Sequence, residues 1–298
     1  MWNRARWCAV RIMQLMRFSR VLRIVAYALI LASGLAGQGT AIHYDTVPAE
    51  DINRRLGDFK DANSAREREL QALFEEVGCN GEHLSEQAVK HAHDPNLICI
   101  LPGQTERQIV VGGHFDFVDR GKGVVDNWSG CSLLPSLYQS LRTFPRRHTF
   151  VFIGFTDEEK GMVGSAFYVH QLSKEDLVGI SAMVNMDSLG TTPTKVELDR
   201  GDKRLAIALG TVASSMHLPL SAVNVHHVGR SDSDSFQDRH VPTIMIHSIT
   251  NQTWPILHSR DDNMSAMRVG DYYDTYRLIA AYLAYLDVTL DAPDAAGN

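Results

Sequence analysis

Apolar residues typical of β-strands recur along this chain in short, regularly spaced runs. The clearest run is residues 149–155, TFVFIGF, in which nearly every position is apolar and β-prone. Such a run is typical of a central strand that is covered on both faces of a sheet. The same pattern predicts further strands, at residues 96–101, 108–112 and 180–186 and near Val223 and Ile244.

Stretches with helical periodicity alternate with these strands. Residues 64–77 carry one apolar face, and Ser64 with Glu67 has the spacing of a capping box at the helix start. The charged run 66–69 within it is interpreted as a solvated helix face. Further helices are predicted at residues 132–141, 163–172, 205–214 and 272–286, and Pro135 is tolerable only in the first turn of its helix. This alternation predicts an α/β fold, a three-layer α/β/α sandwich with a mostly parallel central sheet.

The first 36 residues differ from the rest of the chain. They contain six arginines, no acidic residue and an apolar run of 13 residues at positions 24–36. A basic segment followed by a short apolar run is typical of a secretory signal peptide, and a membrane span needs about 20 apolar residues. We therefore expect a secreted or periplasmic protein, with an N-terminal anchor through residues 24–36 as the alternative. The rest is divided into an N-terminal helical segment (37–94), a core (95–290) and a disordered tail (291–298).

The net charge limits the possible partners of the protein, and the cysteines predict one disulfide and one buried thiol. The full chain has 29 basic and 35 acidic residues, and without the six N-terminal arginines the balance is 23 against 35, or −12. A body this acidic repels nucleic acid and anionic lipid, so we expect no nucleic-acid partner, and membrane contact only through an uncleaved N-terminus. Cys79 and Cys99 are predicted to form a disulfide in an oxidising compartment, and Cys131 to be a buried thiol. No feature of the sequence indicates an oligomeric state.

Candidate chemistry begins at the end of the strand at residues 108–112. His114 and Asp116 follow it two positions apart, so they share a face of extended backbone. Asp126 comes ten residues after Asp116 and precedes an apolar helical stretch. A histidine with two carboxylates at a strand end suits the binding of a divalent metal. Ordinary solvated loop residues are the alternative at this point.

Three more segments bring a histidine or a carboxylate to a strand end or a following loop. The strand at 149–155 runs into Glu158 and Glu159, the strand at 180–186 is followed by Asp187, and His258 lies in a loop after the strand near Ile244. In open α/β sheets functional groups gather at the carboxyl ends of the strands. For the two glutamates alone, a charged helix start is an equally simple explanation.

Five blocks of sequence occur in a characteristic order between about residues 95 and 287: GGHFD, VVDNWSG, DEEKGMVGSAFYV, NMDSLG and LHSRDDN. In this order they resemble the zinc aminopeptidases of the aminopeptidase Y and glutaminyl cyclase group, which includes bacterial leucyl aminopeptidases. The resemblance implies a zinc-exopeptidase-like fold and two Zn²⁺ ions per chain. The chain departs from the pattern in Ser231-Asp232-Ser233, where relatives usually have histidine at the third position.

The resemblance also implies a role for each candidate residue. His114 and Asp187 would hold one metal, Glu159 and His258 would hold the other, and Asp126 would bridge the two. Glu158 falls on the general base of the family. Asp116 falls on the carboxylate that orients the ligand histidine through its second ring nitrogen.

The activity that the resemblance implies is a zinc-dependent aminopeptidase, a metallopeptidase that hydrolyses N-terminal bonds of peptides with a free N-terminus. A glutaminyl-peptide cyclotransferase on the same scaffold is the main alternative, because residues 258–263 also resemble the cyclase loop. A non-catalytic receptor-like relative need not keep ligands and base together as this chain does. A carboxypeptidase requires a cation for the terminal carboxylate of its substrate, for which Arg230 is the candidate.

Overall fold

The computed structural model describes residues 42–225 and 229–291. The predicted signal peptide or anchor, and residues 292–298 of the predicted tail, lie outside the described residues. Within the described part of the chain, no helix is both long enough and apolar enough to cross a membrane.

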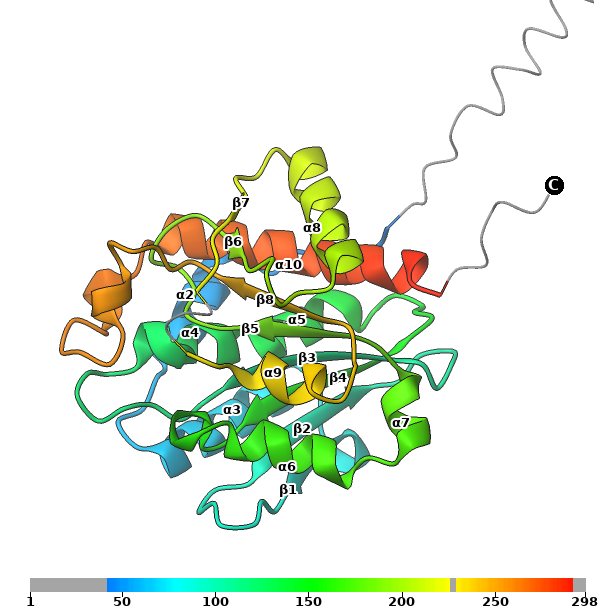
Figure 1. The fold of residues 1–298 in the computed structure, drawn as a ribbon, viewed down its shortest axis with the longest axis horizontal. Coiled ribbons are helices and arrows are strands. Elements are labelled where there is room, and N and C mark those ends of the chain that lie inside the picture. The colour runs from blue at the N-terminus through cyan, green and yellow to red at the C-terminus, as the bar shows by residue number, and fades with distance from the viewer. Residues whose placement is uncertain (1–41, 226–228, 292–298) are drawn as a thin grey trace, which may run out of the picture. The chain divides into compact units, whose positions relative to one another are not determined.

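One eight-stranded sheet runs through the described residues, in the order β1-β2-β4-β3-β5-β8-β6-β7 (Figure 1). The four strands β4, β3, β5 and β8 are mutually parallel, and antiparallel pairs join β1 to β2, β2 to β4 and β6 to β8. The strands are β1 Leu84–Gln87, β2 Asn96–Leu101, β3 Gln108–His114, β4 Thr149–Phe155, β5 Ile180–Met186, β6 Lys195–Val196, β7 Ser221–Ala222 and β8 Thr243–His247.

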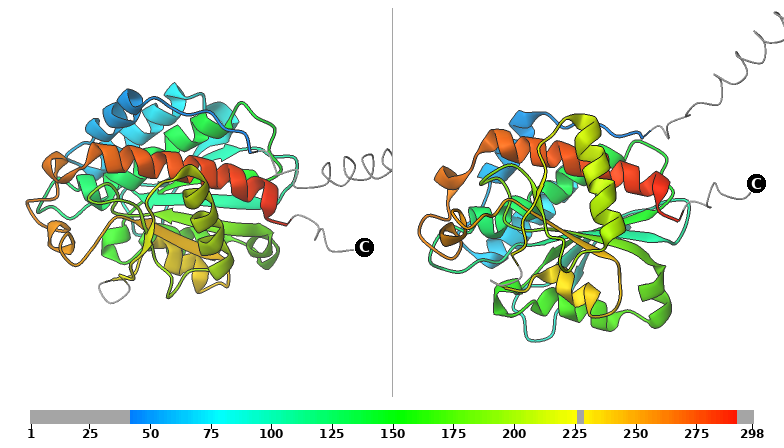
Figure 2. Two further views of the ribbon diagram at one scale, coloured as in Figure 1. Left: turned by 90° about the horizontal axis from the view of Figure 1, so that it is seen from above. Right: turned by 45° about the horizontal axis from the view of Figure 1, so that its top comes forward.

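Helices cover both faces of this sheet, which confirms the three-layer α/β/α arrangement (Figures 1 and 2). On one face lie α2 (Ala49–Gly57), α3 (Asn63–Glu76), α5 (Leu133–Leu141), α8 (Lys203–Met216) and α10 (Val269–Thr289). The other face carries α6 (Val163–Gln171), α7 (Lys174–Gly179) and α9 (Asp232–Gln237). The short α4 (Ser129–Cys131) precedes α5.

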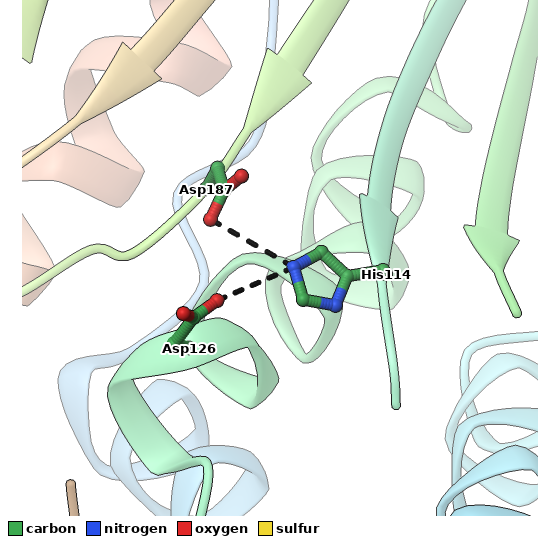
Figure 3. Close-up of side chains that lie close together, drawn as sticks. All are labelled: His114, Asp126 and Asp187. Carbon is green, nitrogen blue, oxygen red and sulfur yellow. Dashed lines mark ion pairs between the residues drawn. The ribbon is translucent and has the colours of Figure 1, made fainter. Parts of the chain in front are cut away.

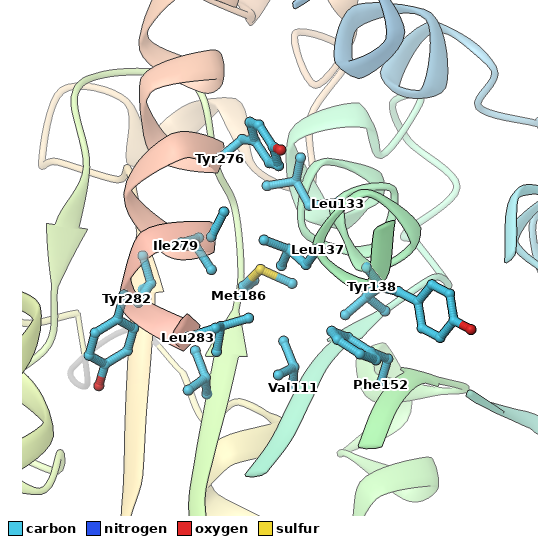
Figure 4. Close-up of a cluster of buried hydrophobic side chains, with 14 of the residues drawn as sticks. Val111, Leu133, Leu137, Tyr138, Phe152, Met186, Tyr276, Ile279, Tyr282 and Leu283 are labelled. Carbon is cyan, nitrogen blue, oxygen red and sulfur yellow. The ribbon is translucent and has the colours of Figure 1, made fainter. Parts of the chain in front are cut away.

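Successive residues of the central strands point into two separate cores. Val111 packs with Leu137 of α5 and Leu283 of α10 (Figure 4), whereas its neighbour Val110 packs on the opposite face with Phe236 of α9. Both faces of the strands are therefore buried, and for this reason their sequences are continuously apolar. The parallel strands held between these cores all deliver their carboxyl ends to one edge of the sheet.

Most of the predicted elements are found, and several bounds agree. The strands β2, β4 and β5 have the predicted limits, β3 continues two residues further to His114, and Pro135 falls in the first turn of α5 as expected. The strand predicted near Val223 is the two-residue β7 at the sheet edge. The helix α2, which was not predicted, and α3 contact α5, so the N-terminal segment packs against the core.

Two predictions about α3 are wrong. Its N-cap is Ala62, and Ser64 lies inside the helix with its hydroxyl donating to the Asp94 carboxylate, so no capping box forms between Ser64 and Glu67. The run 66–69 is not a solvated face, because Arg66 is 0% exposed and Glu67 is 6% exposed. Both residues face inward from a helix that packs against β2 and α5.

The cysteines behave as predicted. Cys79 and Cys99 are bonded, with their Cα atoms 6.3 Å apart, and the disulfide ties the turn after α3 to strand β2. Cys131 is buried in α4 as a free thiol.

Candidate metal centre

The candidate residues meet at the carboxyl edge of the parallel strands. His114 is the last residue of β3, Asp187 directly follows β5, and Glu159 lies in the turn after β4. His258 arrives from the loop beyond β8. Because these strands are neighbours in the sheet, residues far apart in sequence come within a few ångströms of one another.

Two clusters of potential ligand atoms form there and share one carboxylate. In the first, His114 Nε2 is 3.3 Å from Asp126 Oδ1 and 3.8 Å from Asp187 Oδ1 (Figure 3). In the second, His258 Nε2 is 3.1 Å from Asp126 Oδ2 and 2.9 Å from Glu159 Oε2. The ligand atoms of each cluster lie within 4.8 Å of one another. Asp126 therefore presents one oxygen to each histidine.

Asp126 is held by its backbone from the loop that carries His258. The Asp262 carboxylate accepts the backbone N–H groups of Val125 at 2.7 Å and Asp126 at 3.2 Å. On the other side, the Asn127 side chain donates to Met186 O at the end of β5. The peptide bond between Asp126 and Asn127 is cis. These contacts fix Asp126 between β3, β5 and the His258 loop.

Asp116 connects the two strand ends that carry the histidine and the glutamates. Its carboxylate accepts the N–H groups of Glu158 at 3.0 Å and Glu159 at 3.1 Å. The same carboxylate lies 3.4 Å from His114 Nδ1, and the Asp116 carbonyl oxygen lies 3.2 Å from that nitrogen. Asp116 thus contacts the ring nitrogen that faces away from the cluster, and it also fixes the turn after β4.

The adjacent glutamates of that turn point to different atoms. Glu158 Oε2 lies 3.9 Å from His114 Nε2, whereas Glu159 Oε2 faces His258. Both side chains are mostly buried, and Glu159 Oε1 is buried without a hydrogen-bond partner among the described residues. A tight turn therefore lets consecutive carboxylates serve one cavity, as the sequence suggested.

The electrostatics of the clusters indicate a place for a cation. Burial raises the pKa of Glu158 to about 10, and the carboxylates of Asp232, Asp187 and Asp126 add to the increase. Burial alone would lower the pKa of His114, but hydrogen bonds to surrounding carboxylates raise it well above its ordinary value. Hydrogen bonds to Asp126 and Glu159 raise the pKa of His258 to about 10. In the metal-free protein burial and neighbouring carboxylates favour the neutral form of Glu158, and the carboxylates around His114 and His258 favour the charged form of both imidazoles.

The donor set fits zinc. Each cluster offers one imidazole nitrogen and two carboxylate oxygens, without a thiolate, which leaves room for a further ligand at each site. The unpartnered Glu159 Oε1 is a further buried acceptor beside the second cluster.

A cavity of about 120 Å³ opens beside the clusters. One wall is formed by the candidate ligands and Glu158, and the other by residues of β8 and the loop after it, with Arg200 and Arg230. Ser233 lines the cavity where relatives usually have histidine. Trp128 does not line the cavity. It is fully buried in the core, where Trp128 and Phe117 lie near the Arg66 guanidinium. His226 and His227, which the sequence places at an exposed strand end with substrate contact as the alternative, are outside the described residues.

The residues that hold the clusters in place through hydrogen bonds to backbone groups could not be identified from the sequence. Asp262 and Asn127 lie within the blocks LHSRDDN and VVDNWSG, but nothing in their local sequence shows which amide groups they contact. Arg66 was missed because a charged residue in a helix is usually solvated.

An open α/β sheet with paired imidazole and carboxylate clusters at its carboxyl edge defines a class, the metallopeptidases of α/β fold. The model of peptidase family M28 matches residues 96–283, and the chain belongs to this family.

Individual relatives agree with the family. The chain is 28% identical over 155 residues to a probable leucine aminopeptidase 2 of Trichophyton verrucosum, an alignment that covers 47% of this chain and 30% of the relative. The chain thus matches under a third of the length of that curated relative.

Solved structures show the same fold. The LapA aminopeptidase of Legionella pneumophila superposes with a TM-score of 0.71 at 20% identity, covering 87% of this chain and 80% of that one. A zinc aminopeptidase of Bacillus subtilis gives 0.61 at 22% identity, covering 67% and 52%. A glutaminyl cyclase of an Acidobacteriales bacterium gives 0.68 at 15% identity, covering 84% and 97%. At these identities the likeness concerns the fold alone.

Proposed function

We propose that this protein is a zinc-dependent aminopeptidase that holds two Zn²⁺ ions and acts in a secreted or periplasmic location. The observation that carries the proposal is the sharing of Asp126, whose two oxygens lie 3.3 Å and 3.1 Å from the Nε2 atoms of two histidines that belong to separate clusters. His114 and Asp187 would hold one ion, His258 and Glu159 would hold the other, and Asp126 would serve as a ligand of both. The disulfide suits an oxidising compartment.

Zinc in these positions supplies Lewis-acid chemistry, which polarises a substrate carbonyl and lowers the pKa of water. The chain provides the remaining steps. Glu158 takes a proton from the attacking water and delivers it to the amine that leaves. Asp116 keeps Glu158 and Glu159 in their separate directions through hydrogen bonds to both amides.

Peptides with a free N-terminus are the proposed substrates. The cavity continues from the clusters to an apolar wall that includes Met245, Ile249 and Trp254, which can receive the side chain of an N-terminal residue. The similarity to the leucine aminopeptidase of Trichophyton verrucosum and to the LapA aminopeptidase supports this choice of substrate.

A glutaminyl cyclase is the second candidate function. The observation that favours it is the segment at residues 258–263, which also resembles the cyclase loop. Against it stand the blocks VVDNWSG and EEKGMVGS, which lie closer to the peptidase pattern. The set of ligand residues does not separate the two functions, because cyclases of this group retain equivalent residues. A carboxypeptidase is disfavoured, because Arg230 already pairs with Asp238 at 2.6 Å.

The two candidates are separated by their products. We expect release of free amino acid from aminoacyl p-nitroanilides, with N-acetylated versions of the same substrates resistant. Glutaminyl peptides serve as the control for cyclisation. Rapid formation of pyroglutamate from these peptides, without amino-acid release from any unblocked substrate, would favour the cyclase instead.

A further inference from the structure

Arg66 is a buried cation that contacts the loop of the candidate metal centre. It belongs to α3, its side chain is fully buried, and within residues 42–225 and 229–291 its hydrogen bonds go to backbone carbonyls. Burial lowers the pKa of the guanidinium to about 10, so the group stays charged at neutral pH. A buried charge is costly unless its donors are satisfied.

Arg66 Nε donates to Lys60 O, and the three other carbonyls that Arg66 binds lie at both ends of the loop between His114 and Asp126. Nη1 donates to Phe115 O at 3.2 Å and to Gly123 O at 3.0 Å, and Nη2 donates to Lys122 O. Phe115 directly follows His114, and Gly123 lies three residues before Asp126. One guanidinium therefore joins the strand end that carries the histidine to the turn that carries the shared carboxylate.

Aromatic rings and tight backbone packing complete this contact. The guanidinium carbon lies 4.1 Å from the centre of the Phe117 ring and 5.7 Å from that of Trp128. Phe117 belongs to the loop and Trp128 lies two residues after Asp126, and a cation over an aromatic face is favourable. Gly123 has a positive φ of 51°, and a Cβ there would lie 2.3 Å from Phe117 Cβ. The loop is thus closely packed around the cation.

The loop that carries His258 also contacts this segment, but through its amide groups instead of its carbonyl groups. Lys122 N donates to Asp262 O at 2.7 Å, and the Asp262 carboxylate binds the amides of Val125 and Asp126. Arg66 of α3 therefore binds carbonyl groups of the loop, and Asp262 of the His258 loop binds amide groups of the same loop.

We propose that Arg66 is a positioning residue of the metal centre: by binding the carbonyls of Phe115, Lys122 and Gly123, it sets the place of Asp126 between the two histidines. The proposal rests on the proposed function in so far as the clusters bind zinc. It predicts that α3, which contributes no metal ligand, controls metal affinity.

The chain offers a matched control for a test. Arg55 of α2 is also buried, at 2% exposure, but its guanidinium binds Ser136 at 2.7 Å, Gln139 at 2.8 Å and the Glu76 carboxylate at 3.1 Å, away from the metal loop. Replacement of either arginine removes a buried cation and its hydrogen bonds. Only the replacement of Arg66 frees the carbonyls of the loop.

The experiment measures zinc affinity by competition with a chromogenic chelator, together with thermal unfolding of the metal-free proteins. We expect Arg66→Met to weaken zinc binding by about 10- to 100-fold, the usual effect of losing a partner that orients metal ligands. Arg55→Met should unfold at a similarly lowered temperature yet bind zinc within about 3-fold of the wild type, because the positions of its ligands are retained.

If Arg66→Met does not fold, Arg66→Lys and Arg55→Lys decide instead, because an ammonium keeps the charge but lacks the planar fork that reaches both ends of the loop. Equal zinc affinity of the paired variants would overturn the proposal and leave Arg66 a purely structural residue. A wild type that binds zinc but shows no peptidase activity would overturn the proposed function alone. A wild type that binds no zinc would overturn both.

Discussion

Glu158 and Glu159 are neighbours in sequence with the same side chain, and their surroundings give them different tasks. Glu159 faces His258 at 2.9 Å and belongs to a cluster of ligand atoms, whereas Glu158 lies 3.9 Å from His114 and outside both clusters. A carboxylate that is not a ligand is free to accept and donate a proton. At the scale of the residue, this division is the part of the mechanism that is simplest to test.

Glutamine substitutions should separate the two tasks, because each keeps the shape of the side chain and removes its charge. Glu158→Gln is expected to retain zinc and to lose on the order of 10²-fold or more in kcat. Glu159→Gln is expected to release zinc at lower chelator concentration. Metal analysis and steady-state kinetics on both variants provide the comparison. The assignment is falsified if the two phenotypes are exchanged.

His247 gives a prediction about pH. Its Nε2 donates to Val223 O at 2.8 Å and its Nδ1 accepts from Ile249 N at 3.1 Å, so the buried ring is neutral with both nitrogens engaged. Burial lowers its pKa from 6.5 to about 4. Between these values the unfolded chain binds more protons than the folded one, so this contribution to stability is complete above pH 6.5 and is lost as pH falls towards 4.

The expected loss is about 3 kcal/mol over that interval, from the size of the pKa change. Denaturant unfolding of metal-free wild type and His247→Gln between pH 4 and pH 7 measures it. The variant lacks the titrating ring and should show the shallower dependence on pH. Parallel curves for the two proteins would exclude His247 as the cause.

The disulfide acts at the scale of secondary-structure elements. It joins the turn after α3 to β2 across a sequence separation of 20, and so restricts the unfolded chain. A loop of this length is expected to contribute about 3 kcal/mol to the free energy of unfolding. The double variant Cys79→Ala/Cys99→Ala should lose this amount, and reductant should lower the wild type to the same value while leaving the variant unchanged. A wild type indifferent to reductant would show that the bond adds no stability.

The elements that could be predicted are those whose burial is complete. Residues 149–155 and 180–186 lie in the centre of the sheet, and their uninterrupted apolar sequence follows from two covered faces. The two-residue β6 and the six-residue helix α9 leave no such pattern, because each is too short to show a hydrophobic period. Helix α9 begins with Asp232 and is mostly buried, which runs against its composition.

In the candidate site too, some residues could be predicted from the sequence and others could not. The candidate ligands stand at strand ends in ordered blocks, so their convergence could be predicted before the fold was known. The partners that hold them could not, since the bonds from Arg66 to Gly123 and from Asp262 to Val125 span 57 and 137 positions and involve backbone atoms. A side chain that binds carbonyl or amide groups leaves no complementary residue type in the sequence.

At the scale of the whole molecule, two hydrophobic cores hold the central sheet, and the candidate ligands gather at one edge of that sheet. The cores on the two faces fix β4, β3, β5 and β8 side by side, and their carboxyl ends bring three carboxylates and two histidines together. Asp126 makes two clusters into one centre, because a single side chain supplies an oxygen to each. The proposed hydrolysis depends on both clusters, so activity should depend on two ions.

Titration of the metal-free protein with zinc tests this claim most directly. Release of leucine from leucyl p-nitroanilide is followed as zinc is added in steps, and the bound metal is measured at each step. We expect the rate to reach its plateau only when about two equivalents are bound, as a shared two-metal site requires. A full rate at one bound equivalent, or no leucine release at two, would contradict the account.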